Sequence, residues 1–428
     1  MEPTSESPLI NQAHTDRSTK AARRNISIAL AILVVIAIGI TAVVTTSGEN
    51  KARRSGVAYT TGDPLVWTAM DASAYGACAL VNSGQVKCWG RNNKGQLGNG
   101  TTTNSNVPVF VSNISSATSI RAGSYHSCAV LTDGTIKCWG DNSSRQLADG
   151  TTTNRTSPVS VLGIPTTSGA TATSVSTGDN FSCAVLTGGR IKCWGDNYYG
   201  QLGDGTTTNR TSPVSVLGIP TTSGATATSV SSSGMHSCAV LTDGTIKCWG
   251  LNNWAQLGIT VPNSTYRSTP VLVPDISNAT SVSTGGAHSC ALLSDNSMKC
   301  WGNNSEGQVG NDSYNAAAAP LYVPGIATAT SISTGEKHSC AMLTGGTIKC
   351  WGYNPSGQLG TEVGIASRSP IPVVNQETST VTNISGGSEH ACALLTGGAI
   401  NCWGLNDYGQ LGNGTNTSSK TPVSVPNP

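Results

Sequence analysis

The sequence predicts an all-β fold, a seven-bladed β-propeller of four-stranded blades, preceded by one N-terminal transmembrane helix. Three observations lead to this prediction. A segment bounded by two cysteines and closed by Trp-Gly occurs seven times, and its tryptophans recur every 50 to 55 residues. The chain is rich in glycine, with 50 in 428 residues, and only 11% charged. Repeats of this length are single supersecondary units that bury their apolar faces by stacking on one another.

Each copy of the segment is predicted to form a β-hairpin. In the second copy, strand-forming residues flank a Thr-Asp-Gly turn that ends at Gly134. A three-residue loop with this glycine in the left-handed conformation makes Leu131 and Thr135 a hydrogen-bonded pair. Pairs alternate along the hairpin, so Cys128 and Cys138 become a non-hydrogen-bonded pair with Cα atoms about 4.5 Å apart.

This register predicts a disulfide across every hairpin, because the separation lies within the range that a disulfide spans. The pairing uses every cysteine and leaves none over, which settles a count that would otherwise permit many connectivities. The predicted pairs are Cys78–Cys88, Cys128–Cys138, Cys183–Cys193, Cys238–Cys248, Cys290–Cys300, Cys340–Cys350 and Cys392–Cys402.

The rest of each repeat supplies two more strands. In the second repeat, residues 117–123 form a strand that ends in glycine before the hairpin, and residues 158–161 form an outer strand beside a proline. Four short strands per repeat are typical of a propeller blade, with the repeated tryptophan expected to pack that blade. The first strand, 65–71, is expected to meet the last outer strand, 422–425, in one blade or at one seam.

Three segments precede the propeller, which is expected over residues 65–428. Residues 1–25 are polar and predict a short cytoplasmic tail. Residues 26–44 contain nothing ionisable, and these nineteen residues are close to the ~20 that cross a bilayer as a helix. They predict a transmembrane signal anchor. A cleaved signal peptide is the alternative, but the residues that follow match an Ala-x-Ala cleavage site poorly. Residues 45–64 are predicted to be a linker.

The cysteines set the expected orientation of this anchor. Basic residues lie on both sides of the apolar segment, so charge alone does not decide the orientation. Disulfides persist outside the reducing cytosol. The paired cysteines therefore predict an extracytoplasmic propeller, at the cell surface or in a periplasm, and a cytoplasmic N-terminus. The alternative is a cytosolic protein with reduced, buried cysteines.

A second constant element, Asn-x-x-x-Gln, follows each Trp-Gly. It occurs at Asn92 and Gln96, Asn142 and Gln146, Asn197 and Gln201, Asn252 and Gln256, Asn304 and Gln308, Asn354 and Gln358, and Asn406 and Gln410. Together with the His-Ser-x-Ala and Asp-Gly elements of the hairpin, it resembles the regulator-of-chromosome-condensation repeat. The resemblance covers about residues 65–425 and implies a seven-bladed propeller.

The family indicated by this resemblance has several functions. It includes a nuclear guanine-nucleotide exchange factor, a plant ultraviolet receptor that uses clustered tryptophans, and secreted bacterial inhibitors of other enzymes. A shared fold does not choose among them. The paired cysteines make this chain similar to the secreted and surface bacterial members, whereas the exchange-factor role needs a cytosolic or nuclear GTPase.

Composition and motifs argue against several other classes of function. A net charge of +2 leaves no electrostatic footprint for nucleic acid. No Gly-x-Ser-x-Gly, His-Glu-x-x-His or phosphate-binding loop indicates catalysis, and no cofactor is expected. A histidine precedes the hairpin cysteine in five copies, but Phe181 and Gly76 replace it in the other two. These histidines are therefore expected to pack at blade junctions rather than to bind a metal.

The repeated Asn and Gln are expected to satisfy backbone groups inside each blade. A partner must then recognise what varies between repeats, namely the connections and the residues after Trp-Gly. Large aromatic residues and arginine are typical interface anchors. The candidate binding surface is Arg91, Lys94, Tyr198, Tyr199, Trp254, Tyr353 and Tyr408. If equivalent turns share one face, the two adjacent tyrosines and the tryptophan form its best patch.

The sequence as a whole predicts a membrane-anchored, extracytoplasmic propeller that acts as a non-enzymatic binding module. Its expected partners are the membrane, through residues 26–44, and an unknown extracytoplasmic protein or glycan. Two alternatives remain open. A guanine-nucleotide exchange factor-like regulator of a GTPase would require a cytosolic propeller. An enzyme with a site in the propeller channel would require a cluster of carboxylates with histidine or metal.

Overall fold

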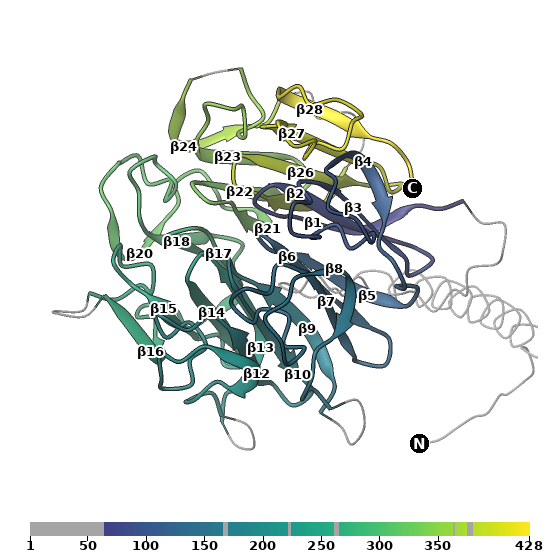
Figure 1. Ribbon diagram of the computed structural model, residues 1–428. Helices are drawn as coiled ribbons and strands as arrows, with labels where there is room; N and C mark the ends of the chain where they lie inside the picture. The colour runs from purple at the N-terminus through teal and green to yellow at the C-terminus, as the bar shows by residue number, and fades with distance from the viewer. Residues whose placement is uncertain (1–63, 166–169, 221–223, 261–264, 363, 375–379) are drawn as a thin grey trace, which may run out of the picture. The chain divides into compact units, whose positions relative to one another are not determined.

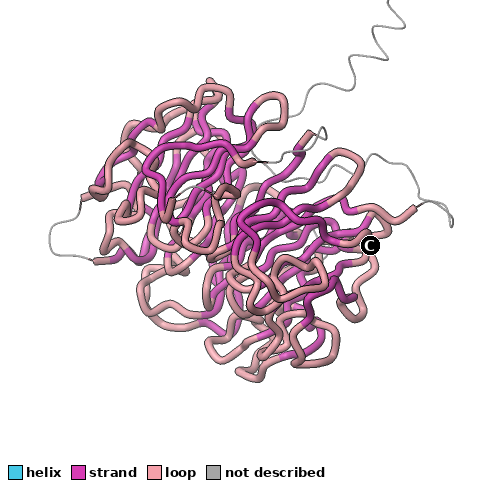
Figure 2. The backbone as a smooth tube through the Cα atoms, turned by 90° about the horizontal axis from the view of Figure 1, so that it is seen from above, coloured by secondary structure: helices cyan, strands magenta, loops and turns pink. Residues whose placement is uncertain are grey.

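The propeller consists of seven antiparallel sheets of four strands each. The computed structural model describes residues 64–428, apart from 166–169, 221–223, 261–264, 363 and 375–379. This part of the chain is built from strands, turns and loops (Figure 2). Across the described residues we find no helix with the length and apolar character needed to cross a bilayer. The predicted span at residues 26–44 lies outside the described residues and stays a prediction.

Each blade takes its four strands consecutively from the chain (Figure 1). The first strand of each is the innermost, because the first strands of neighbouring blades contact one another around the ring. The first strands are β1 (Trp67–Ala72), β5 (Ala117–Ala122), β9 (Ala172–Thr177), β13 (Ala227–Ser233), β17 (Ala279–Thr284), β21 (Ala329–Thr334) and β25 (Val381–Gly386). The second strands are β2 (Gly76–Val81), β6 (His126–Leu131), β10 (Phe181–Leu186), β14 (His236–Leu241), β18 (His288–Leu293), β22 (His338–Leu343) and β26 (His390–Leu395).

The third and outer strands complete each blade, which confirms the predicted architecture. The third strands are β3 (Val86–Gly90), β7 (Ile136–Gly140), β11 (Arg190–Gly195), β15 (Ile246–Leu251), β19 (Met298–Gly302), β23 (Ile348–Tyr353) and β27 (Ile400–Gly404). The outer strands are β4 (Ser105–Phe110), β8 (Arg155–Ser160), β12 (Arg210–Ser215), β16 (Tyr266–Leu272), β20 (Ala317–Tyr322), β24 (Ala366–Pro372) and β28 (Ser419–Val425). Every outer strand contains a proline, a residue that sheets tolerate at an edge.

The hairpin between the second and third strands has the predicted register. The Leu131 N–H donates to the Thr135 carbonyl at 2.8 Å, and Gly134 has a φ of +80°. Cys128 lies opposite Cys138, with Cα atoms 4.1 Å apart, slightly closer than expected. All seven predicted disulfides are present. The cystine is buried, so each hairpin carries its cross-link inside the core.

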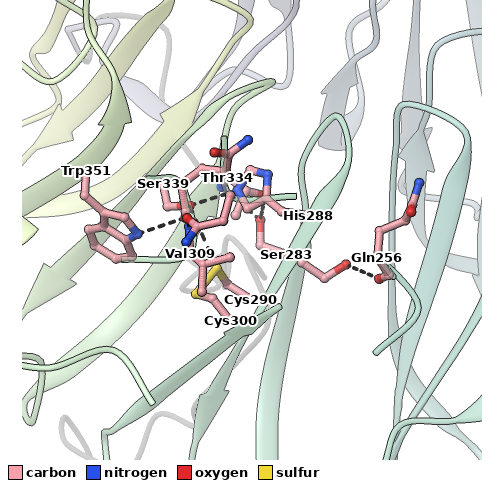
Figure 3. Close-up of a disulfide and its surroundings, with 12 residues drawn as sticks. Gln256, Ser283, His288, Cys290, Cys300, Val309, Thr334, Ser339 and Trp351 are labelled. Atoms are coloured by element: carbon pink, nitrogen blue, oxygen red, sulfur yellow. Dashed lines mark hydrogen bonds between the residues drawn. A yellow bond between two sulfur atoms is a disulfide. The ribbon is translucent and has the colours of Figure 1, made fainter. Parts of the chain in front are cut away.

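The repeated tryptophan joins blades, which corrects the expectation that it packs its own blade. Trp139 is fully buried in a cluster with Cys78, Cys88 and Leu97 of the preceding blade. Its indole Nε1 donates to the main-chain carbonyl of Gln96, also in the preceding blade, at 2.9 Å. All seven tryptophans make this bond, including Trp89 to Gln410 across the ends of the chain. In Figure 3, Trp351 lies beside the Cys290–Cys300 disulfide of the blade before it.

The ring closes at a seam between the first and last blades. Strand β1 packs against β25 and β26, and Trp67 and Met70 share a core with Leu394 and Val425. The outer strands also meet there, because Gly414 N–H donates to the Asn106 carbonyl at 2.8 Å. Of the two predicted closures, the seam is therefore the one present, since no strand is exchanged between the end blades.

Deleting the chain after Gly414 is expected to lower the midpoint of thermal unfolding by several degrees. The deletion removes β28, exposes the β27 edge and removes buried Val425 from the seam. A variant that lacks only residues 427–428 is the control and should melt like the intact chain. Equal melting temperatures for the two truncations would show that the seam does not depend on this strand.

Candidate interaction surface

One face of the propeller carries both the turns around its channel and the variable turns. In the first blade, Arg91 N–H donates to the Tyr75 carbonyl at 2.9 Å, which ties the residue after the third strand to the turn before the second. Equivalent bonds recur around the ring, so both kinds of turn lie at the same end of every blade. We call this surface the mouth face. It comprises residues 73–75 with 91–96, 123–125 with 141–146, 178–180 with 196–201, 234–235 with 251–256, 285–287 with 303–308, 335–337 with 353–358, and 387–389 with 405–410.

The repeated Asn and Gln hold the variable turns, as predicted. Asn92 Oδ1 accepts from the Leu97 N–H at 2.9 Å, and Gln96 Oε1 accepts from the Lys94 N–H at 2.8 Å. The asparagine bond recurs in every blade. So does the glutamine bond. These amides belong to the scaffold, and the residues between them form the surface.

All the predicted surface residues lie on the mouth face, where they take part in several local contacts. Tyr198 is 70% exposed and packs edge-on against Tyr199 with ring centroids 4.8 Å apart. Trp254, in the next blade, is 47% exposed, and no ring contact joins it to this pair among the described residues. Lys94 faces Asp141 at 3.8 Å, while Tyr353 lies under the Lys337 ammonium at 5.4 Å.

Arg91 and Tyr408 belong to a different cluster, which the sequence did not predict. The Arg91 guanidinium lies 5.0 to 5.6 Å from the ring centroids of Tyr75, Tyr125 and Tyr408. Tyr75 contacts the other two rings at 5.8 and 5.9 Å. These four residues, the tyrosine cluster, come from the first, second and last blades. Aligning the repeats on their first cysteine would have found the missing pair, since both tyrosines lie three residues before it.

The mouth of the central channel forms a cavity of about 420 Å³. In every blade, the turn between the first and second strands contributes to its lining. Tyr75, Tyr125, Asp179 and Glu336 contribute the aromatic and acidic parts of the lining. The Ser124 hydroxyl donates to Asp179 Oδ1 at 2.6 Å, and the Ser388 hydroxyl donates to Glu336 Oε2. Both carboxylates are thus held in place by serines of neighbouring blades.

The environment of the mouth disfavours negative charge. Burial raises the pKa of the Asp179 carboxyl and Glu336 raises it further, against the hydrogen bond from Ser124, which lowers it. Burial and the adjacent Tyr125 raise the pKa of Tyr75 to about 12, and the Glu336 carboxylate contributes to the rise. Tyr75 is therefore a neutral phenol at physiological pH.

Below the mouth, the first strands are joined by a ring of side-chain bonds. At six of the seven junctions, a side chain on one first strand accepts a hydrogen bond from a backbone N–H of the neighbouring one. The acceptors are Ser176, Ser231, Ser283, Ser333, Ser385 and Asp71. At the remaining junction Arg121 takes this position, and arginine cannot accept. Burial raises the pKa of Asp71, which Arg121 opposes.

The histidines pack at the blade junctions, as predicted. All five are fully buried, and burial lowers the pKa of His236, His288 and His338 to about 3 and of His126 and His390 to about 4. Three of them bond through Nε2 to a serine of the next blade, namely His126 to Ser182, His236 to Ser289 and His288 to Ser339 (Figure 3 shows the last). His390 bonds to the Gly76 carbonyl. No group of three potential metal ligands gathers in the part of the chain that the structure describes.

His338 lacks this bond because Ala391 occupies the serine position of the next blade, and both of its ring nitrogens are buried without a partner. Changing Ala391 to Ser is expected to raise the free energy of unfolding by about 1 kcal/mol, the usual net worth of a neutral hydrogen bond. Denaturant titration measures the gain. The same substitution beside His338→Phe should give no gain, and an equal gain there would show that the hydroxyl does not act through the histidine.

Comparisons with known proteins concern the repeats and the fold of this chain. The chain matches the RCC1-like domain over residues 15–327 and the regulator of chromosome condensation (RCC1) repeat over residues 329–358 and 381–410. It is 26% identical over 234 residues to the ultraviolet-B receptor UVR8 of Arabidopsis thaliana, which covers 54% of this chain and 52% of the receptor. It is 28% identical over 258 residues to the probable E3 ubiquitin-protein ligase HERC4 of Homo sapiens, which covers 59% of this chain and 19% of the ligase.

Solved structures give the same fold. The crystal structure of Prp20p from Saccharomyces cerevisiae has a TM-score of 0.71 at 20% identity and covers 86% of this chain and 87% of that one. The crystal structure of human WBSCR16 has a TM-score of 0.70 at 19% identity and covers 80% and 94%. At these identities the structures establish the fold alone. The chain spans about half the length of the receptor and less than a fifth of the ligase.

Proposed function

The chain belongs to the RCC1-like domain family, and from that premise we propose that it is a membrane-anchored, extracytoplasmic binding module without enzymatic activity, whose mouth face binds a protein. The observation that carries the proposal is where the aromatic residues lie. The mouth face holds Trp254 and six of the nine described tyrosines, namely Tyr75, Tyr125, Tyr198, Tyr199, Tyr353 and Tyr408. Tyrosine, tryptophan and arginine are the residues that most often anchor protein interfaces.

The scaffold does not need these aromatic residues. The tryptophans of the repeats, the Asn and Gln of the turns and the histidines all bond within or between blades. The mouth-face tyrosines make no such repeated bond, and most blades hold other residue types at their positions. Positions that vary on a constant scaffold are where a propeller can recognise one partner.

Anchoring and location are part of the proposal. Residues 26–44 have the length and composition of a membrane span. Every cysteine has a partner placed for a disulfide, and stable disulfides belong to oxidising compartments. Thiol labelling of intact and permeabilised cells tests this location. Labelling that appears only after reduction supports it, whereas reactive thiols that appear on permeabilisation alone would place the propeller in the cytosol.

A cytosolic propeller would favour the alternative role as a regulator of a GTPase. The study of Prp20p names its binding to Gsp1p and histones, which shows that a propeller of this fold can bind proteins of quite different kinds. Exchange activity toward small GTPases in a purified assay would establish that role here and contradict the proposed one.

Capture experiments test the proposed face. The oxidised fragment 56–428 is used as bait for cell-surface extracts, as wild type, with Tyr198→Ala and Trp254→Ala together, and with Arg91→Ala and Tyr408→Ala together. Tyr322→Ala is the matched control, because this tyrosine is 59% exposed on outer strand β20. A partner lost with either mouth-face pair but kept with the control supports the proposal. A partner that survives both pairs and is lost with Tyr322→Ala would contradict it.

A further inference from the structure

The cavity at the channel mouth has acidic groups without a cationic partner. Asp179 and Glu336 come from the third and sixth blades and both line the opening, where the Glu336 carboxylate raises the pKa of Asp179. The four ion pairs among the described residues are Lys94–Asp141, Arg155–Asp149, Arg210–Asp204 and Lys420–Glu362, and none includes either carboxylate. Neither carboxylate therefore has an ion-pair partner among the described residues, although Lys337 also lines the cavity.

The nearest basic residues are engaged elsewhere. Lys337 lies next to Glu336 in the chain, but its ammonium sits 5.4 Å from the ring centroid of Tyr353, in a variable turn. Arg91 is stacked among the three tyrosine rings of the tyrosine cluster. Arg121 donates to the carbonyl of Ile120 on its own strand. None of these three cations forms an ion pair with Asp179 or Glu336.

The lining of the cavity also has an aromatic part. Tyr75 and Tyr125 line it with rings 5.8 Å apart, and Arg91 and Tyr408 pack against them. Aromatic faces attract cations, and the two carboxylates of the same lining attract them more strongly. A cavity of about 420 Å³ is within the size range of small-ligand sites and can admit one long side chain from a partner that covers the mouth face.

We propose that the channel mouth binds a basic side chain, lysine or arginine, of the protein partner, with its charged end between Asp179 and Glu336 and its stem against Tyr75 and Tyr125. This inference deepens the proposed function and rests on it. The aliphatic stem of lysine or arginine can pack against the two tyrosine rings, while its charged head binds the two carboxylates. The carboxylates provide the specificity, because only a cationic side chain can form ion pairs with both of them.

The test uses the oxidised full chain and capped pentapeptides. Calorimetry compares Gly-Gly-Arg-Gly-Gly and Gly-Gly-Lys-Gly-Gly with Gly-Gly-citrulline-Gly-Gly, which has the shape of the arginine peptide without its charge. The two basic peptides are expected to bind saturably at millimolar concentration or below, and the citrulline peptide is not. Glu336→Gln and Asp179→Asn are each expected to weaken binding about tenfold, as for the loss of one member of a charge pair.

Asp407→Asn is the matched control, since this carboxylate is exposed on the mouth face but does not line the cavity. It should leave peptide affinity unchanged, and thermal melts establish that each variant is folded. Absence of saturable binding by both basic peptides, equal binding of the citrulline peptide, or equal weakening by Asp407→Asn would each overturn the inference. If the peptides fail while the Arg91 and Tyr408 pair still abolishes capture of a partner, the side-chain site is wrong and the proposed function stands.

Discussion

Lowering the pH from 7.5 to 4.5 is expected to remove most of the propeller's stability while its disulfides remain intact. Five histidines are fully buried, and burial holds their pKa values at about 3 to 4. In the unfolded chain the pKa of histidine is about 6.5. Because the folded pKa is the lower one, the stability from these groups is complete above about pH 6.5 and is lost as the pH falls toward the folded pKa.

The expected magnitude is large. Each buried histidine lowers the free energy of unfolding by roughly 1.4 kcal/mol per pH unit below its unfolded pKa. At pH 4.5 the five histidines together lower it by about 10 kcal/mol or more. That is comparable with the whole stability of an ordinary domain. Asp71 and Asp179 act in the opposite direction, because burial raises the pKa of each, but they are two groups against five.

Denaturant midpoints measured between pH 7.5 and 4.5 test this expectation, with His338→Phe as the matched variant. Phenylalanine already occupies the equivalent position in the third blade as Phe181, which is fully buried. The variant should fold and should lose less stability per pH unit than the wild type. A stability that stays constant down to pH 5, or an unchanged slope in the variant, would mean that the buried histidines do not govern acid unfolding.

Trp139→Ala is expected to destabilise the propeller by about 3–5 kcal/mol, the range for truncating a fully buried large aromatic side chain. The change leaves a cavity between the first and second blades beside Cys78 and Leu97, and the Gln96 carbonyl loses its donor. The closed ring depends on every junction between blades. Weakening one junction should therefore lower the denaturant midpoint of the whole propeller and not only the local protection of two blades.

Denaturant unfolding measures this loss, and Trp254→Ala is the control on the same residue type. Trp254 is 47% exposed and makes no bond between blades, so its loss should cost within about 0.5 kcal/mol. Trp139→Phe keeps most of the apolar volume and should cost about 1 kcal/mol through the lost hydrogen bond. Equal effects of the two alanine variants would refute the role of the repeated tryptophan in joining blades.

The fold could be predicted from the sequence because the same residues occupy the turn and strand positions in seven consecutive repeats. The register of one hairpin followed from the Thr-Asp-Gly turn, and it placed Cys128 opposite Cys138 as the structure has them. The scaffold role of Asn92 and Gln96 followed from their recurrence, since a binding residue need not recur in every blade.

What the sequence could not provide is how different repeats meet. The tryptophan bonds to a carbonyl more than forty residues earlier, and no local pattern marks that partner. Tyr75 and Tyr408 touch only because the ring closes at the seam. Asp179 and Glu336 occupy the same position in two repeats, four residues before the first cysteine, but only the closed ring brings them to one cavity. The predicted patch of Tyr198, Tyr199 and Trp254 rested on equivalent turns of neighbouring blades, and the structure shows a ring contact within the tyrosine pair.

Photocrosslinking in the native cells tests most directly whether the mouth face is the binding surface. A photoreactive residue is placed at position 198 on the mouth face or at position 322 on outer strand β20, both of which are well exposed tyrosines. A covalent partner that forms from position 198 and not from position 322 is the expected result. A partner that forms from position 322 alone would contradict the account.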